Sequence, residues 1–139
     1  MGILWSPLGR AGAIGTIVAI IVNLLIYGIG SAADIDWEAG ETDPNAIAVA
    51  LNTVLAGVFA TILAMVLLRY LKVKRPVVIF LAIGIVFTLL SLAVPLGADA
   101  DTSTRWLLAT MQIVAGVLIL GALGYELNVG RKVDAAASD

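Results

Sequence analysis

Four long runs of uncharged, apolar residues restrict what this sequence can fold into. Each run is 20 to 23 residues long. An α-helix needs about 20 residues to cross a hydrocarbon layer roughly 30 Å thick, and in lipid every backbone amide must be bonded within the chain. The sequence therefore predicts an all-α fold, an integral membrane four-helix bundle in one domain, with spans at 11–33, 46–70, 76–98 and 105–127.

Composition supports the membrane class and argues against several kinds of chemistry. Hydrophobic residues make up 61% of the 139-residue chain and charged residues only 13%, whereas about 25% of an ordinary soluble domain is charged. The chain has no cysteine and no histidine, so thiol chemistry, the commonest general base and the commonest transition-metal ligand are missing. We therefore expect no enzymatic activity, no cofactor, no metal site and no nucleic-acid partner.

Residues beside the runs predict where the helices begin. Asp43 and Pro44 are typical of an N-cap followed by the first helical position. Pro76 opens the third span in the same way, and either Ser103 or Thr104 can cap the fourth. The small, polar tail after the fourth span is expected to be mobile.

The distribution of basic residues predicts how the helices are oriented. Seven of the eight lysines and arginines flank one end of the predicted bundle, and only Arg105 flanks the other. The positive-inside rule places the basic end in the cytoplasm, together with both termini. We therefore expect a multi-pass protein of the cell membrane, surrounded by the lipid bilayer. The seven residues are Arg10, Arg69, Lys72, Lys74, Arg75, Arg131 and Lys132.

The opposite end is acidic, because its two loops carry seven carboxylates against one arginine, a net charge of −6. Trp37 and Trp106 also fall here, as expected for aromatic residues at a membrane interface. The acidic loops have two interpretations: a solvated surface without a role, or an outer face that docks a cationic partner or concentrates cations. Their spacing does not match a calcium-binding loop. The acids are Asp34, Asp36, Glu38, Glu41, Asp43, Asp99 and Asp101.

Each span carries a polar residue at about the same distance from the acidic end. A rise of 1.5 Å per residue places the four roughly 10 Å below that boundary. Tyr27 lies one turn after the first of them, on the same predicted helix face. This polar layer consists of Asn23, Tyr27, Asn52, Ser91 and Gln112.

The polar layer has a structural and a functional interpretation. Hydrogen bonds between membrane helices fix helix order and register, at about 0.6 kcal/mol each on average. Alternatively, the layer lines a pocket open toward the acidic end. The uncharged runs within the spans contain none of the charged residues that mark ion or proton pathways.

Small residues recur at helical spacing in all four spans. Such small-xxx-small patterns let membrane helices approach closely. They predict tight helix–helix contacts but do not indicate a function. Examples are Gly12 and Gly15, Ala56, Gly57, Ala60, Thr61 and Ala64, Gly84 and Thr88, and Gly116.

Four short motifs, one in or beside each span, point to a known family. They are N-x-x-x-Y (Asn23, Tyr27), R-x-x-x-x-x-R-P (Arg69, Arg75, Pro76), a late serine and proline (Ser91, Pro95) and T-M-Q-I-V-A-G around Gln112. In these motifs the chain resembles the DUF6069 family of small four-helix prokaryotic membrane proteins. The resemblance implies a four-helix membrane fold, and it implies no activity because the family has no established one.

Two functional hypotheses follow from these observations. The small size, the helix faces suited to packing and the acidic end favour a non-catalytic accessory or assembly subunit of a larger membrane protein complex, or a homo-oligomer. The polar layer favours a small transporter or ligand-binding membrane protein. Proton-coupled export is not expected, because four-helix exporters use a glutamate in their first helix where this chain has Asn23. The sequence leaves open whether the helices close into one bundle or splay apart.

Overall fold

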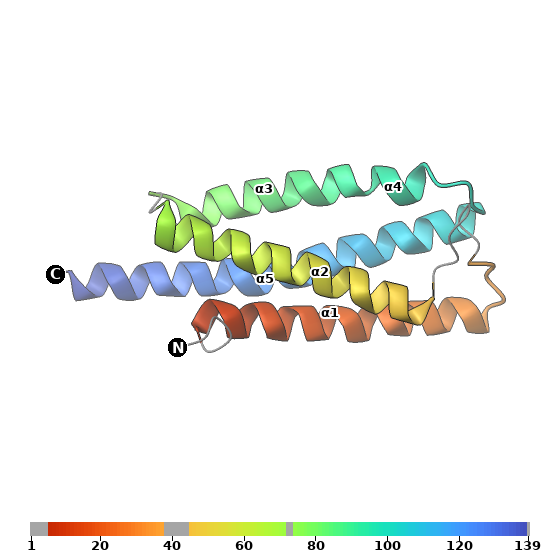
Figure 1. Ribbon diagram of the computed structural model, residues 1–139, viewed down its shortest axis with the longest axis horizontal. Coiled ribbons are helices and arrows are strands. Elements are labelled where there is room, and N and C mark those ends of the chain that lie inside the picture. The colour runs from red at the N-terminus through yellow and green to blue at the C-terminus, as the bar shows by residue number, and fades with distance from the viewer. Residues whose placement is uncertain (1–5, 38–44, 72–73, 139) are drawn as a thin grey trace.

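Four helical rods run side by side along the molecule in the computed structural model, which describes residues 6–37, 45–71 and 74–138 (Figure 1). Each rod is long and apolar enough to cross a membrane. The predicted all-α, four-helix architecture is therefore confirmed. The elements are α1 (Pro7–Ala32), α2 (Ala46–Met65) with a π-helical turn (Val66–Tyr70), α3 (Pro76–Ser91), the short α4 (Ala93–Leu96) and α5 (Thr102–Ala137).

Two of the helices begin at side-chain caps that the sequence patterns did not single out. Ser6 caps α1 and Asn45 caps α2, each accepting a hydrogen bond from the backbone amide three residues on, at 3.0 and 2.8 Å. Such caps satisfy a backbone amide that the helix itself leaves unpaired. The prediction that Asp43 caps the second span is wrong, and Asp43 and Pro44 lie outside the described residues.

The other two long helices show one correct and one incorrect prediction. Pro76 occupies the first position of α3, as predicted. The N-cap position of α5 is Asp101, so the predicted cap at Ser103 or Thr104 is wrong. Thr104 is buried and its hydroxyl donates a hydrogen bond to the backbone carbonyl of Asp36. This threonine therefore joins the start of α5 to the loop after α1.

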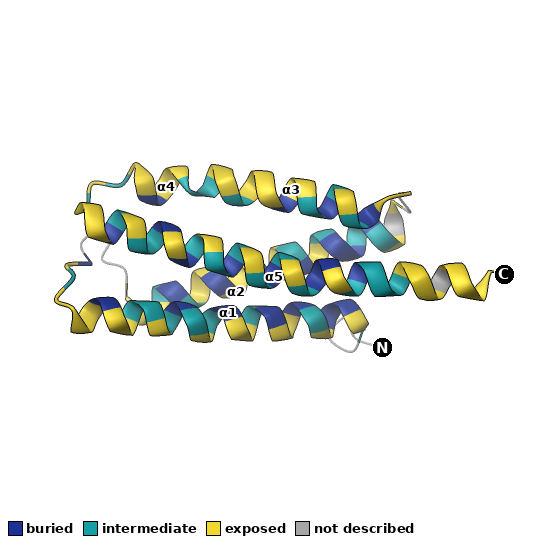
Figure 2. Ribbon diagram, turned by 180° about the vertical axis from the view of Figure 1, so that it is seen from behind, coloured by how far each residue is buried: buried dark blue, intermediate teal, exposed yellow. Residues whose placement is uncertain are grey.

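The tail that was expected to be mobile is helical, because α5 continues to Ala137. Its 36 residues correspond to about 54 Å at 1.5 Å per residue, against a hydrocarbon layer of roughly 30 Å. Figure 2 shows its last turns projecting past the other helices with mostly exposed residues. We call this segment, residues 128–137, the α5 extension.

Proline interrupts the third rod near its end. Pro95 has no backbone N–H to donate to the carbonyl four residues earlier, so it cannot complete the helical bond to Ser91. The rod is divided at Leu92 into α3 and α4. Ser91 and Pro95, on either side of the interruption, both line the cavity described below.

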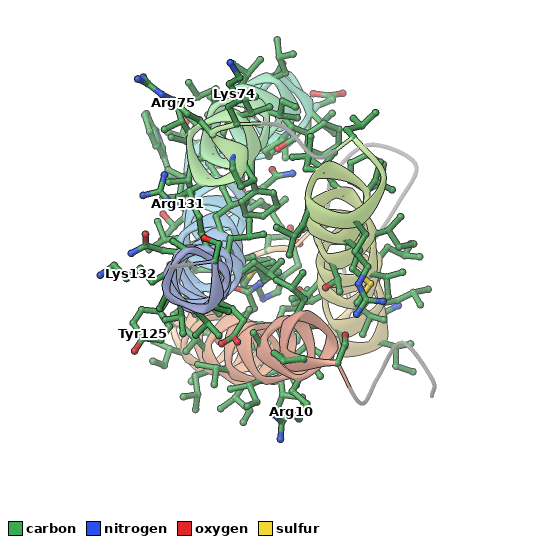
Figure 3. The ribbon with its side chains drawn as sticks, turned by 90° about the vertical axis from the view of Figure 1, so that its left-hand side faces the viewer. Arg10, Lys74, Arg75, Tyr125, Arg131 and Lys132 are labelled. Carbon is green, nitrogen blue, oxygen red and sulfur yellow. The ribbon has the colours of Figure 1, made fainter. Side chains whose placement is uncertain are left out.

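Charged residues gather at the two ends of the molecule. Both termini and the α2–α3 connection lie at one end (Figure 1), and Figure 3 looks onto that basic end. Arg10, Lys74, Arg75, Arg131 and Lys132 surround it. Arg69 is exposed in the last turn before the connection, and Lys72 lies outside the described residues.

The acidic end contains the α1–α2 and α4–α5 loops. The carboxylates described there are exposed, at Asp34, Asp36, Asp99 and Asp101. The other three predicted acids, Glu38, Glu41 and Asp43, lie outside the described residues.

Reciprocal glycine–threonine contacts hold α1 against α2. A Cβ at Gly12 would lie 2.0 Å from Thr61 Oγ1, and a Cβ at Gly57 would lie 1.8 Å from Thr16 Oγ1. Each threonine hydroxyl donates to the carbonyl of the glycine four residues earlier in its own helix, at 2.7 Å. The hydroxyls are therefore fixed in the space that a side chain on the facing glycine would need.

A related contact joins α3 to α5. A Cβ at Gly84 would lie 2.4 Å from a Leu120 methyl carbon, and one at Gly116 would lie 3.0 Å from Thr88. Thr88 again donates to the carbonyl four residues earlier, at 2.8 Å. The two helix pairs, α1–α2 and α3–α5, thus approach closely through glycine on both partners.

The turn that ends α1 contains a residue in the left-handed region. Asp34 has φ 54°, a conformation that costs most residues about 1–2 kcal/mol and costs glycine almost nothing. The backbone amides of Asp34 and Ile35 donate to Ser31 and Gly30 at 3.3 and 3.1 Å. These bonds satisfy carbonyls at the end of the helix, as in a Schellman turn.

Asp34→Gly is expected to raise the free energy of unfolding by about 1 kcal/mol, because glycine adopts the left-handed region without strain. Denaturant unfolding in detergent measures the change. Asp34→Ala is the control, since it removes the same charge, keeps the Cβ and has no preference for the left-handed region. Equal stability of the two variants would mean that the charge, and not the backbone conformation, determines the result.

Candidate functional site

A cavity of about 520 Å³ lies between α2 and α3 and extends along most of their length, from Ala48 and Ala98 near the acidic end to Leu63 and Phe80 near the basic end. α3 packs along α5 but contacts α2 at few points. Figure 1 shows α2 and α3 close together near their connection and far apart toward the acidic end. The volume falls within the range of about 300–1,000 Å³ typical of small-molecule sites. We call this cavity the α2–α3 cleft.

The cleft brings together polar residues from all four rods. Asn23 of α1, Asn52 of α2, Ser91 of α3 and Gln112 of α5 all line it. Tyr27, the fifth residue of the predicted polar layer, does not belong to the lining. Its ring packs against Trp37, with ring centroids 4.7 Å apart.

Asn23 forms the direct side-chain link between α1 and α2 in the cleft. Its Nδ2 donates to Thr53 Oγ1 at 3.1 Å, and the Thr53 hydroxyl donates to the Val49 carbonyl at 2.8 Å. Asn23 is only 3% exposed, and its Oδ1 has no hydrogen-bond partner among the described residues. Leaving a buried polar atom without a hydrogen bond costs about 1–3 kcal/mol of stability. The Oδ1 of Asn23 can therefore accept a hydrogen bond that no described residue supplies.

The other polar side chains of the cleft also have hydrogen-bond donors or acceptors that are not used. In the described part of the chain, the amides of Asn52 and Gln112 donate to and accept from no other residue. Ser91 donates to the Thr88 carbonyl at 2.7 Å, which leaves its oxygen free to accept. A hydrogen-bonded cluster is therefore formed by Asn23 and Thr53, whereas the remaining amides face the cleft without partners.

Two phenylalanines close part of the side opening. Phe59 of α2 and Phe87 of α3 both line the cleft, and their rings stack with centroids 5.5 Å apart. Each is 55% exposed. This aromatic pair was not predicted from the sequence, although the signal was present: Phe59 lies seven residues after Asn52, and Phe87 lies four residues before Ser91, both spacings that share a helix face.

The chemistry of the cleft is that of neutral dipoles and apolar surface. No ionisable side chain occurs among its described lining residues. The exposed carboxylates of the acidic end lie outside it, and the described residues contain no group of three or more His, Cys, Asp or Glu side chains that could hold a metal ion. Such a site can bind and orient a neutral molecule, and it offers no nucleophile–base pair for catalysis.

The fold and the cleft define the class of this protein: a bundle of four helices suited to spanning a membrane, with a cavity of small-molecule size between two of them. Within that class, the chain belongs to the DUF6069 family, described as a family of unknown function, whose model matches residues 5–129. The suspected family is therefore confirmed. No curated protein and no solved structure matches the chain.

Proposed function

We propose that this chain is a multi-pass protein of the cell membrane that binds a small molecule in the α2–α3 cleft and catalyses no reaction on it. The observation that carries the proposal is the cleft of about 520 Å³ lined by Asn23, Asn52 and Gln112. Asn23 is buried, and buried polar groups in proteins are normally hydrogen-bonded, whereas Asn52 is exposed and Gln112 is half-buried. Small-molecule sites are typically apolar cavities with a few polar groups that orient the ligand. Amides whose donors and acceptors are not hydrogen-bonded can supply these groups.

The charges at the two ends support an orientation for this binding protein. The residues at the basic end, where both termini lie, follow the positive-inside rule when that end is cytoplasmic. The polar residues of the cleft, Asn23, Asn52, Ser91 and Gln112, then lie in the outer half of the membrane. Trp106 at the acidic end is 62% exposed, in keeping with a position at the outer interface.

Filling the cleft tests the proposal. Ala56 lines the cleft, so Ala56→Phe places a ring in the ligand's space, and bound ligand is expected to fall at least about tenfold because overlapping atoms cannot be accommodated in a packed site. Native mass spectrometry of the protein, purified from its own membrane in mild detergent, measures the bound small molecule.

The matched control is Ala82→Phe, an exposed position of α3 outside the cleft. This variant is expected to carry as much bound small molecule as the original protein. A protein that carries no small molecule, or an Ala56→Phe variant that carries as much as Ala82→Phe, would contradict the proposed function.

A second proposal, an accessory or assembly subunit of a larger membrane protein complex, is favoured by the α5 extension. These turns carry exposed residues beyond the rest of the bundle. A photoreactive group at Val133, which is 62% exposed, is expected to crosslink a protein partner in the native membrane. Val117, 66% exposed in the apolar middle of α5, is the control for contacts with lipid. Equal protein crosslinking at both positions would contradict docking on the extension.

A further inference from the structure

We propose that the ligand of the α2–α3 cleft is an uncharged amphiphile, with a hydroxyl-bearing head and an apolar body, that enters sideways from the outer leaflet of the bilayer. This inference rests on the proposed function and specifies the class of ligand. Four features of the cleft support it: the absence of ionisable residues in its described lining, the order of polar and apolar residues along it, its unpaired amides and its apolar side opening.

The lining favours an uncharged ligand. Its described side chains are apolar apart from amides and hydroxyls, and transferring an unpaired ion to such surroundings is far more costly than transferring a hydroxyl. The described carboxylates of the acidic end are exposed and do not line the cleft. A cation would therefore remain at that surface, and an anion would be repelled by it.

The polarity of the cleft changes along its length. Asn23, Asn52, Ser91 and Gln112 form a polar band, with a short apolar part at Ala48, Val94 and Ala98 between it and the acidic end. The longer apolar part, toward the basic end, is lined by Leu63, Phe80, Ile119 and Leu120. Each polar residue lies within about 10–15 Å of the acidic end at 1.5 Å per residue. A molecule lying along the helices would thus place its head toward the acidic end and its apolar body deeper. This is the orientation of an amphiphile in the outer leaflet.

The unpaired amides favour a hydroxyl in the head. Asn52 and Gln112 each offer a carbonyl oxygen and an NH₂ group, and neither is bonded to another described residue. A hydroxyl donates one hydrogen bond and accepts others, so it can bond to both kinds of group at once. A ketone or an ester only accepts, and it would leave the amide oxygens unpaired.

The amide of Asn23 adds to this preference. Its Nδ2 is bonded to Thr53 and its Oδ1 is unpaired in the described part of the protein. Thr53 has a single hydroxyl hydrogen and donates it to the Val49 carbonyl, so it can accept from Nδ2 but cannot also donate to Oδ1. The unpaired Oδ1 can accept a hydrogen bond from a ligand hydroxyl.

The side opening favours entry from lipid. Its edges are formed by Phe59 and Phe87, both apolar and half-exposed on the face that the bilayer would cover. Exposed side chains change rotamer within picoseconds to nanoseconds, so these rings can move aside. A water-soluble molecule would lose all of its hydration before reaching such an opening, whereas the apolar body of an amphiphile in the bilayer is already dehydrated and only its head loses water.

Photolabelling in vesicles tests the ligand class. The full-length protein is reconstituted in phosphatidylcholine vesicles with three diazirine probes of equal chain length: a long-chain alcohol, the corresponding carboxylate and the corresponding alkane. The alcohol is expected to label cleft residues of α2 and α3 about tenfold more than the other two probes, the change expected when one or two hydrogen bonds are lost. Asn52→Leu combined with Gln112→Leu is expected to lower alcohol labelling by about tenfold for the same reason.

The two proposals can fail separately. If native mass spectrometry finds a bound molecule that Ala56→Phe displaces, but the carboxylate or the alkane labels the cleft as strongly as the alcohol, the ligand class is wrong and the proposed function stands. Alcohol labelling that is unchanged in the leucine variant also overturns the ligand class. If none of the probes labels the cleft and Ala56→Phe displaces no bound molecule, both proposals fail.

Discussion

Gly12→Ala is expected to lower the free energy of unfolding by about 3 kcal/mol, the upper part of the usual range for inserting atoms into a packed core. The added Cβ would lie 2.0 Å from Thr61 Oγ1. Thr61 cannot move away without losing its hydrogen bond to the Gly57 carbonyl. The variant must therefore separate α1 from α2, and denaturant unfolding in detergent measures the loss.

Two further variants show whether the helix contact is the cause. Among the described residues, no atom outside α1 lies within 4 Å of a Cβ at Gly28, so Gly28→Ala is expected to be neutral or to stabilise by up to about 1 kcal/mol through helix propensity. Thr61→Ala, combined with Gly12→Ala, removes the hydroxyl and leaves a Cβ contact of 3.1 Å. The double variant is expected to recover most of the lost stability. A double variant as unstable as Gly12→Ala would mean that another contact causes the loss.

The four helices could be predicted from the sequence because a membrane helix is specified by the length and hydropathy of a local run of residues. The helix ends depended on details that such runs do not contain. Asp43 and Asn45 are both good caps, and the choice between them depends on how the loop enters α2. Asn45 accepts the bond from Ala48, so the cap lies two residues after the predicted Asp43, while α2 begins at Ala46, the first residue of the predicted span.

Depth alone predicted that four polar residues lie close together, since residues at one level of a bundle are neighbours; they are Asn23, Asn52, Ser91 and Gln112. The cleft between them could not be predicted from depth. It exists because α3 packs against α5 and diverges from α2, which is a property of the whole bundle. Tyr27 shows the same limit: it shares a helix face with Asn23 in sequence, but its ring packs against Trp37 from the loop.

Trp37 was predicted at the membrane interface together with Trp106, and the structure gives the two residues different surroundings. Trp106 is 62% exposed, whereas Trp37 is only 9% exposed. The loop after α1 turns back and places the Trp37 indole against the end of the helix. Its Nε1 donates to Ser31 Oγ at 2.8 Å. Gly30 leaves room for the ring, since a Cβ there would lie 2.5 Å from Trp37 Cζ2.

Trp37→Ala is therefore expected to lower the free energy of unfolding by about 3 kcal/mol, the usual cost of removing a buried aromatic side chain. Trp106→Ala, the matched control at the same end, is expected to change it by less than about 0.5 kcal/mol because the side chain is exposed. Trp37→Phe keeps an aromatic ring but loses the bond to Ser31, so an intermediate loss of about 1 kcal/mol is expected. Denaturant unfolding in detergent measures all three variants.

Equal stabilities of Trp37→Ala and Trp106→Ala would show that the loop contributes nothing to the bundle. The expected difference has a structural consequence for the cleft. Trp37 packs in one cluster with Val49 of α2 and Met111 of α5, and no described residue of α3 belongs to that cluster. It holds α1, α2 and α5 together at the acidic end and leaves α3 unattached to α2 there. Trp37→Ala is thus expected to weaken ligand binding as well, because Asn23, Asn52 and Gln112 are held in place by these three helices.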